Sequence, residues 1–134
     1  MNRRIIICFA LGVAGWSGVA AFAGVDADMA EARSVLEAAV QAHPQNAELY
    51  VHLGFAYRKL EKADDAQKAF EKAIEIDPKK AEAHYMLGLI YEKKNINDKA
   101  LSAWKSCLSA AKDEGMKDTA QRHIHRLEHA STTK

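Results

Sequence analysis

The sequence predicts an all-α protein, a short α-solenoid of helix-turn-helix repeats that ends in a capping helix. First, one pattern of 34 residues is written twice in register between residues 46 and 112, and a self-match at this period indicates stacked supersecondary units. Second, apolar residues in each copy recur at intervals of three and four, which places them on one face of a helix. Third, His43-Pro44 and Asp77-Pro78 interrupt these runs at short intervals, as hairpins of helices require.

The two copies share large and small residues position by position. Leu53-Gly54, Tyr57, Ala66, Phe70 and Ala73 recur 34 positions later as Leu87-Gly88, Tyr91, Ala100, Trp104 and Cys107. These residues resemble the tetratricopeptide repeat (TPR) family. With Ala47 as the first position, the first copy matches the family pattern throughout. In the second copy, which opens at Ala81, His84 replaces a large residue and Lys112 replaces proline. The resemblance implies a right-handed solenoid with complete repeats at 47–80 and 81–114.

Small residues are expected where the two helices of a repeat meet. Gly54 is predicted to face Ala66, and Gly88 to face Ala100, because small side chains let two helix backbones approach closely. A glycine placed in a helix by chance would cost about 0.5–1 kcal/mol against alanine. Its recurrence at one register favours a packing role.

Residues 24–45 are predicted to form the second helix of a repeat whose first helix is missing. The repeat frame places its small, large and turn residues at Ala32, Leu36, Ala39 and Pro44. Asp28 and Glu31 have the spacing of a capping box, so the helix is expected to begin near Asp26. The exposed flank of residues 27–42 then needs solvent-tolerant side chains or a partner.

Residues 115–134 are predicted to form a C-terminal capping helix and tail, with Gly115 as the boundary. Arg122 stands where a third repeat would have glycine, so no further helix can pack closely there. A capping helix with a polar outer face is typical of a repeat array. With a half-repeat at each end, the chain has six helices, which meets the minimum of about three stacked units.

The amino terminus has the layout of a secretory signal peptide over residues 1–23. Residues 1–4 are basic, residues 5–25 carry no charge, and Ala21-Phe22-Ala23 forms a small-x-small site before Gly24. The alternative is an uncleaved anchor through residues 5–25, which would just span a bilayer. Both place the repeats outside the cytoplasm. We therefore expect an exported protein that is periplasmic or envelope-associated, or anchored to the inner membrane.

Charge and cysteine content narrow the classes further. Lys and Arg number 19 and Asp and Glu number 18, and loss of Arg3 and Arg4 with the signal peptide would leave 17 against 18. That balance disfavours nucleic-acid binding. Removal of Cys8 would leave Cys107 as the single thiol. It occupies a small-residue position of the repeat, which favours a buried filler over a reactive group.

No catalytic motif is present in residues 24–134: there is no phosphate-binding glycine loop, nucleophile elbow or paired-cysteine site. We therefore predict no enzyme, no cofactor and no metal site. The best metal candidate is His125 with His129, four apart on one helix face. Arg122 and Arg126 beside them would repel a cation, which favours a solvated polar face. His84 is expected to be a packed histidine.

The resemblance implies a concave groove lined by the first helix of each repeat. Its predicted residues are Val51, His52, Phe55, Arg58, Lys59, Tyr85, Met86, Leu89, Glu92 and Lys93. The middle of this set is apolar and its far end is charged, so an apolar helix or extended segment of another protein is the expected ligand. The alternative is that Phe55, Tyr85 and Leu89 are consumed by packing between helices.

Three functions remain open at this point. The first is an exported, non-catalytic adaptor that binds another protein of the cell envelope through this groove. The second is a self-assembling scaffold, a possible homo-oligomer, whose half-repeat ends stack on neighbouring copies. The third is a metal-binding protein or enzyme that uses His125 and His129.

Overall fold

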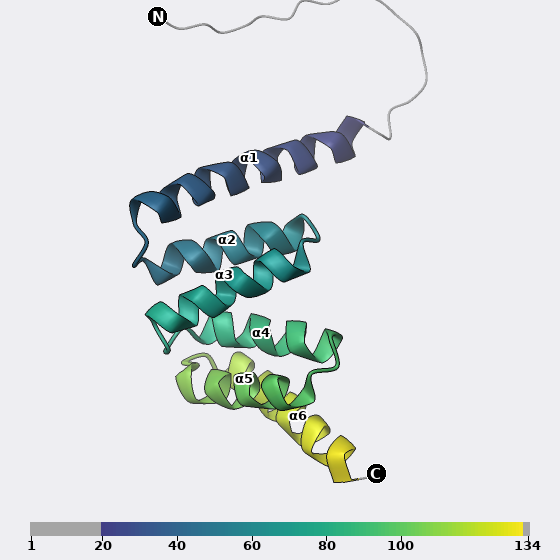
Figure 1. Cartoon of the computed structure of the whole chain (residues 1–134). Helices are drawn as coiled ribbons and strands as arrows, with labels where there is room; N and C mark the ends of the chain where they lie inside the picture. Colours follow the sequence, from purple (N-terminus) through teal and green to yellow (C-terminus); the bar gives the residue numbers. More distant parts are fainter. Residues whose placement is uncertain (1–19, 133–134) are drawn as a thin grey trace, which may run out of the picture.

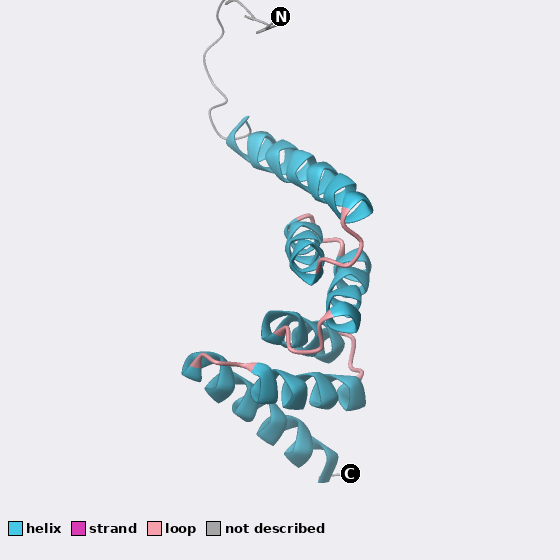
Figure 2. Ribbon diagram, turned by 90° about the vertical axis from the view of Figure 1, so that its left-hand side faces the viewer, coloured by secondary structure: helices cyan, strands magenta, loops and turns pink. Residues whose placement is uncertain are grey.

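The computed structural model describes residues 20–132, with side chains described over residues 27–130. Six helices occur in this range, and no strand. They are α1 (Ala20–Ala42), α2 (Ala47–Lys59), α3 (Ala63–Ile76), α4 (Ala81–Lys93), α5 (Asn97–Ala110) and α6 (Glu114–Thr132). Figures 1 and 2 show these helices stacked in chain order, with α1 at one end and α6 at the other. The all-α solenoid predicted from the sequence is confirmed.

Helix pairs follow the predicted repeats. The most extensive contacts join α2 to α3 and α4 to α5, while α3 packs against α4 and links the two pairs. The flanking helices α1 and α6 contact α2 and α5 respectively. The turns inside both repeats have one geometry, because Glu61 and Asn95, 34 positions apart, both adopt the left-handed conformation with φ of 58°. Two complete repeats therefore lie between two single helices.

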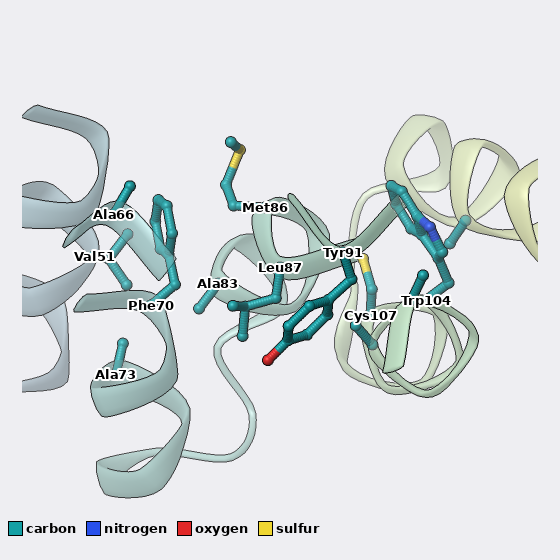
Figure 3. Close-up of a cluster of buried hydrophobic side chains, with 13 residues drawn as sticks. Val51, Ala66, Phe70, Ala73, Ala83, Met86, Leu87, Tyr91, Trp104 and Cys107 are labelled. Carbon is teal, nitrogen blue, oxygen red and sulfur yellow. The ribbon is translucent and has the colours of Figure 1, made fainter. Parts of the chain in front are cut away.

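The core follows the repeat frame through α3, α4 and α5. Phe70, Leu87, Trp104 and Cys107 are its largest fully buried side chains. Figure 3 shows Leu87 of α4 with Phe70 on one side and the Trp104–Cys107 pair on the other. Burial of these apolar side chains is the main favourable contribution to folding.

The nearest neighbours of the two recurring glycines differ from the predicted ones. A Cβ atom added at Gly54 would lie 2.7 Å from Cε1 of Phe70, and one added at Gly88 would lie 2.6 Å from Cε2 of Trp104. The nearest neighbours are therefore the aromatic rings of the second helix, and not Ala66 or Ala100 as expected. Each glycine leaves room for a ring to approach the helix backbone closely.

Consecutive units are joined by one hydrogen bond that recurs with the repeat. Tyr57 Oη donates to Glu37 Oε1 at 2.6 Å, and Tyr91 Oη donates to Glu71 Oε1 at 2.6 Å. Both members of the second pair lie 34 positions after those of the first. Glu37 of α1 thus occupies the place that Glu71 has in α3, which identifies α1 as the second helix of a repeat.

Both terminal helices begin earlier than predicted. α1 is already helical at Ala20, the first described residue, so it runs through the Asp28–Glu31 spacing without a cap. α6 starts at Glu114, where Asp113 Oδ2 accepts a hydrogen bond from the Met116 N–H at 2.7 Å, so Gly115 lies inside the first turn. Residues 1–19 of the predicted signal peptide lie outside the described residues. Within residues 20–132, no helix combines the length and apolar character needed to cross a bilayer.

Candidate binding groove

The ten predicted groove residues come from α2 and α4, and we call the face that carries them the groove face. Val51 and Met86 are buried in the core. Phe55 and Tyr85 are half-buried, since each packs its ring edge-to-face on the aromatic residue of its own repeat. The centroids of Phe55 and Phe70 are 5.4 Å apart, and those of Tyr85 and Trp104 are 5.1 Å apart. Both rings therefore contribute to packing and remain partly accessible on the groove face.

At the charged end of the groove face, some side chains form ion pairs within the described structure and others do not. His52 is exposed and lies 3.6 Å from Glu48, measured from Nε2 to Oε1. Arg58, Lys59 and Lys93 are exposed, and none of them forms an ion pair with another described residue. Arg58, Lys59 and Lys93 lie in the last turns of α2 and α4, where positive charge also complements the helix dipole.

Glu92 is held inside the molecule by α5 and α6. Its Oε1 accepts hydrogen bonds from Trp104 Nε1 and from His123 Nδ1, both at 2.6 Å, and its Oε2 pairs with Arg126. Only 17% of the side chain is exposed. The ring of His123 also stacks on Trp104, with centroids 4.2 Å apart. This network fastens α6 to the second repeat.

The sequence contained a signal for this network that prediction did not use. His123 and Arg126 stand 34 positions after Leu89 and Glu92. The repeat frame thus extends into α6, which takes the place of the first helix of a third repeat. Arg122, at the glycine position of that frame, is exposed on the outer side and pairs with Asp118.

Four of the ten predicted residues meet around one cavity between the two repeats. Its volume is about 510 Å³, and its lining comes from α2, the following turn, α3 and α4: Arg58, Glu61, Ala63, Ala66, Met86, Leu89, Ile90 and Lys93. We call it the Leu89 cavity. Ligand sites commonly have volumes of about 300–1,000 Å³. The remaining six predicted residues, Val51, His52, Phe55, Lys59, Tyr85 and Glu92, do not line this cavity.

The side chains considered for chemistry lie in unreactive surroundings. Burial raises the pKa of the Cys107 thiol to about 11, and the nearby Glu82 carboxylate adds to the shift. Cys107 is thus the buried filler that was predicted. His84 is also packed, as expected, with Nε2 donating to the Pro78 carbonyl at 2.7 Å. His125 and His129 lie ring to ring on exposed α6. Among the described residues, no cluster of three or more His, Cys, Asp or Glu side chains is placed to hold a metal ion.

The helix pairing and the repeated contacts define a helical-repeat protein, and comparison with known families identifies which one. Two family models, both described as tetratricopeptide repeat, match residues 26–90 and 81–114. Together they extend over residues 26–114, which is more than half of the chain. The chain belongs to the tetratricopeptide repeat family.

Solved structures with the same fold come from several sources. PcrH in complex with the chaperone binding region of PopD superposes with a TM-score of 0.70 at 15% identity, covering 82% of this chain and 86% of the other. The Sgt2 TPR domain from Aspergillus fumigatus gives 0.67 at 21%, covering 84% and 76%. The first TPR of Spaghetti, bound to an HSP90 peptide, gives 0.68 at 16%, covering 84% and 87%. At these identities the likeness shows the fold. A search of curated protein sequences finds no match.

Proposed function

We propose that this protein is a non-catalytic adaptor that binds a segment of another protein on its groove face. The observation that carries the proposal is the Leu89 cavity, where an apolar lining from two repeats meets exposed basic side chains. Phe55 and Tyr85 extend the apolar surface along α2 and α4. Two solved structures of the same fold hold such ligands, a region of PopD in PcrH and an HSP90 peptide in Spaghetti.

We further propose that the adaptor works outside the cytoplasm, in the periplasm or elsewhere in the cell envelope. The support is the sequence of the amino terminus, which has basic residues at 3 and 4, a long uncharged run and a small-x-small site at residues 21–23. Retention of residues 5–25 as an anchor to the inner membrane would leave the repeats on the same side.

The combination of Phe55→Ser with Leu89→Ser tests the proposed function. Both side chains are partly exposed on the groove face, so their loss should abolish capture of a partner from envelope extract. The free energy of unfolding should fall by less than the roughly 2–5 kcal/mol of a buried Leu→Ala change. Capture and thermal melting are measured on one preparation.

The matched control is Val35→Ser, which removes an exposed apolar side chain from α1, away from the groove face. This variant should capture the same partner as the unmodified protein. Unchanged affinity of a folded double variant would contradict the proposal and would redirect attention to α1.

A second candidate function, self-assembly, is favoured by the surface of α1. Val35 is 63% exposed, whereas Ala69 and Ala103, at the equivalent positions of α3 and α5, are 5% and 7% exposed. Within the described residues, no helix precedes α1 in the stack to cover this side chain. A second copy of the chain could cover Val35, which stands at a repeat position that is buried in α3 and α5.

A further inference from the structure

The Leu89 cavity has an apolar floor at the junction of two repeats. Ala66 of α3 and Met86 of α4 are buried beneath it, and Leu89 and Ile90 form half-buried walls. A single aliphatic side chain from a partner would contact apolar groups of both repeats there, and burial of such an anchor is a main source of binding free energy.

The edge of the cavity carries more unpaired positive charge than negative charge. Arg58 from α2 and Lys93 from α4 line it together, and Glu61 is the one carboxylate among the lining residues. Neither cation forms an ion pair with a described residue. A partner therefore meets two cations whose charge is not neutralised by a salt bridge.

The neighbours of Lys93 show why the excess is positive. Glu92 is occupied by Trp104, His123 and Arg126 of the helices behind it. On the other side, Lys94 Nζ bonds both Asp64 Oδ1 and Gln67 Oε1 at 2.6 Å. Of these three consecutive charged residues, Lys93 alone remains available to a ligand.

We propose, on the basis of the proposed function, that the Leu89 cavity selects an acidic partner segment. The segment inserts one aliphatic side chain into the cavity and places an Asp or Glu side chain, within one helical turn of that anchor, beside Arg58 and Lys93. A basic segment would bring like charges together at the edge, so the same surface rejects it. The carboxylate comes from a side chain inside the segment and not from a chain terminus.

Peptide pools of about twelve residues, acetylated and amidated at their ends, test this inference on the purified protein. One pool carries a central leucine flanked by glutamates, a second has lysines instead, and a third has alanine instead of leucine. The acidic leucine pool should bind about tenfold more tightly than either of the others, a difference of about 1.4 kcal/mol. Leu89→Asp should abolish binding of that pool.

Reversing the charge of the two cations tests whether they determine the preference for acidic peptides. Arg58→Glu combined with Lys93→Glu should transfer the preference to the lysine pool, whereas Lys68→Glu, an exposed lysine of α3 outside the cavity, should leave the preference unchanged. Thermal melts confirm that the variants are folded. Binding that depends on Phe55 and Leu89 but not on peptide charge would overturn the inference and leave the proposed function standing. Absence of binding by all three pools would also overturn it. A groove-face variant with unchanged partner capture would instead contradict the proposed function.

Discussion

One glycine in each repeat allows its two helices to pack closely. At Gly54 and Gly88, the space where a side chain would begin is filled by the ring of Phe70 or Trp104. Both rings are fully buried, so they cannot move aside without disturbing the core. The residue that matters for packing is therefore the aromatic partner, which lies 16 positions later in each copy of the repeat.

Gly88→Ala should lower the free energy of unfolding by about 1–3 kcal/mol, because the new methyl group overlaps the Trp104 ring. In a helix without this contact, the same change stabilises by about 0.5–1 kcal/mol. Gly115→Ala in α6 is the comparison, since the added Cβ would lie 3.1 Å from an exposed Asp113 carboxylate oxygen, which needs to shift only slightly, and would meet no buried ring. Chemical denaturation of both variants measures the difference. Equal stability of Gly88→Ala and the unmodified protein would show that the ring does not limit the helix approach.

The hydroxyl of Tyr57 joins α1 to the first repeat. Burial and then the hydrogen bond to Glu37 raise the pKa of Tyr57 to about 12, whereas tyrosine in an unfolded chain titrates near pH 10. Because the folded state favours the neutral phenol, this contribution to stability is complete below about pH 10. It is lost as the pH rises through about 12.

Tyr57→Phe should therefore lower stability at neutral pH and should lose less further stability than the unmodified protein between about pH 10 and 12. Hydrogen bonds to charged groups typically contribute about 1.5–3 kcal/mol. Denaturation at pH values on both sides of this window provides the measurement. Tyr50→Phe is the control, because no described residue forms a hydrogen bond with that hydroxyl. Identical pH dependence of the two variants would contradict the assignment.

At the scale of the element, the two terminal helices differ from prediction for separate reasons. Residues 20–25 contain no proline, and a single glycine costs a helix only about 1 kcal/mol, so nothing stops α1 from continuing to Ala20. Gly115 was predicted to be a helix boundary because it is a glycine. Asp113 instead caps α6, and the helix includes Gly115. Glycine alone is a weak stop signal in this chain.

The position of α6 depends on Glu92. Glu92→Ala would leave the buried Trp104 Nε1 donor without its acceptor, a loss that costs about 1–3 kcal/mol. It would also release His123 and Arg126. Amide exchange should increase throughout α6 and remain unchanged in α2 and α3.

Lys105→Ala, which removes the exposed pair with Glu128 between α5 and α6, should cost about 0–1 kcal/mol. Uniform exchange across all helices would indicate that α6 does not open separately.

The repeat frame predicted most of the fold and part of the candidate site. Residues 34 positions apart occupy equivalent places in successive repeats. The cores around Leu87 and Trp104 could therefore be predicted from the sequence. The burial and hydrogen bonds of Glu92 could not be predicted in this way. Its partners are 12 to 34 positions away, on helices whose placement depends on packing. The Leu89 cavity likewise depends on how the end of α2 meets α4.

On the scale of the whole molecule, the two ends of the solenoid have unlike surfaces. The α1 end exposes Val35, whereas the α6 end exposes the Arg122–Asp118 ion pair. An apolar face stacked on a polar one would bury charge without compensation, so head-to-tail filaments are disfavoured. If copies associate, the self-complementary contact is between two α1 helices, which closes as a dimer.

Native mass spectrometry of the protein isolated from the cell envelope tests export and self-assembly in one measurement. An adaptor with a cleaved signal peptide should give the mass of residues 24–134 as a monomer at every concentration. Cleavage after Ala23 would remove residues 20–23 of α1 and would leave Glu37 and its bond to Tyr57 in place. A mass that includes Met1 would favour the anchor instead. A dimer that grows with concentration and disappears in Val35→Lys would favour the scaffold, because a charge in that contact has no partner. Higher multiples would contradict closure through α1.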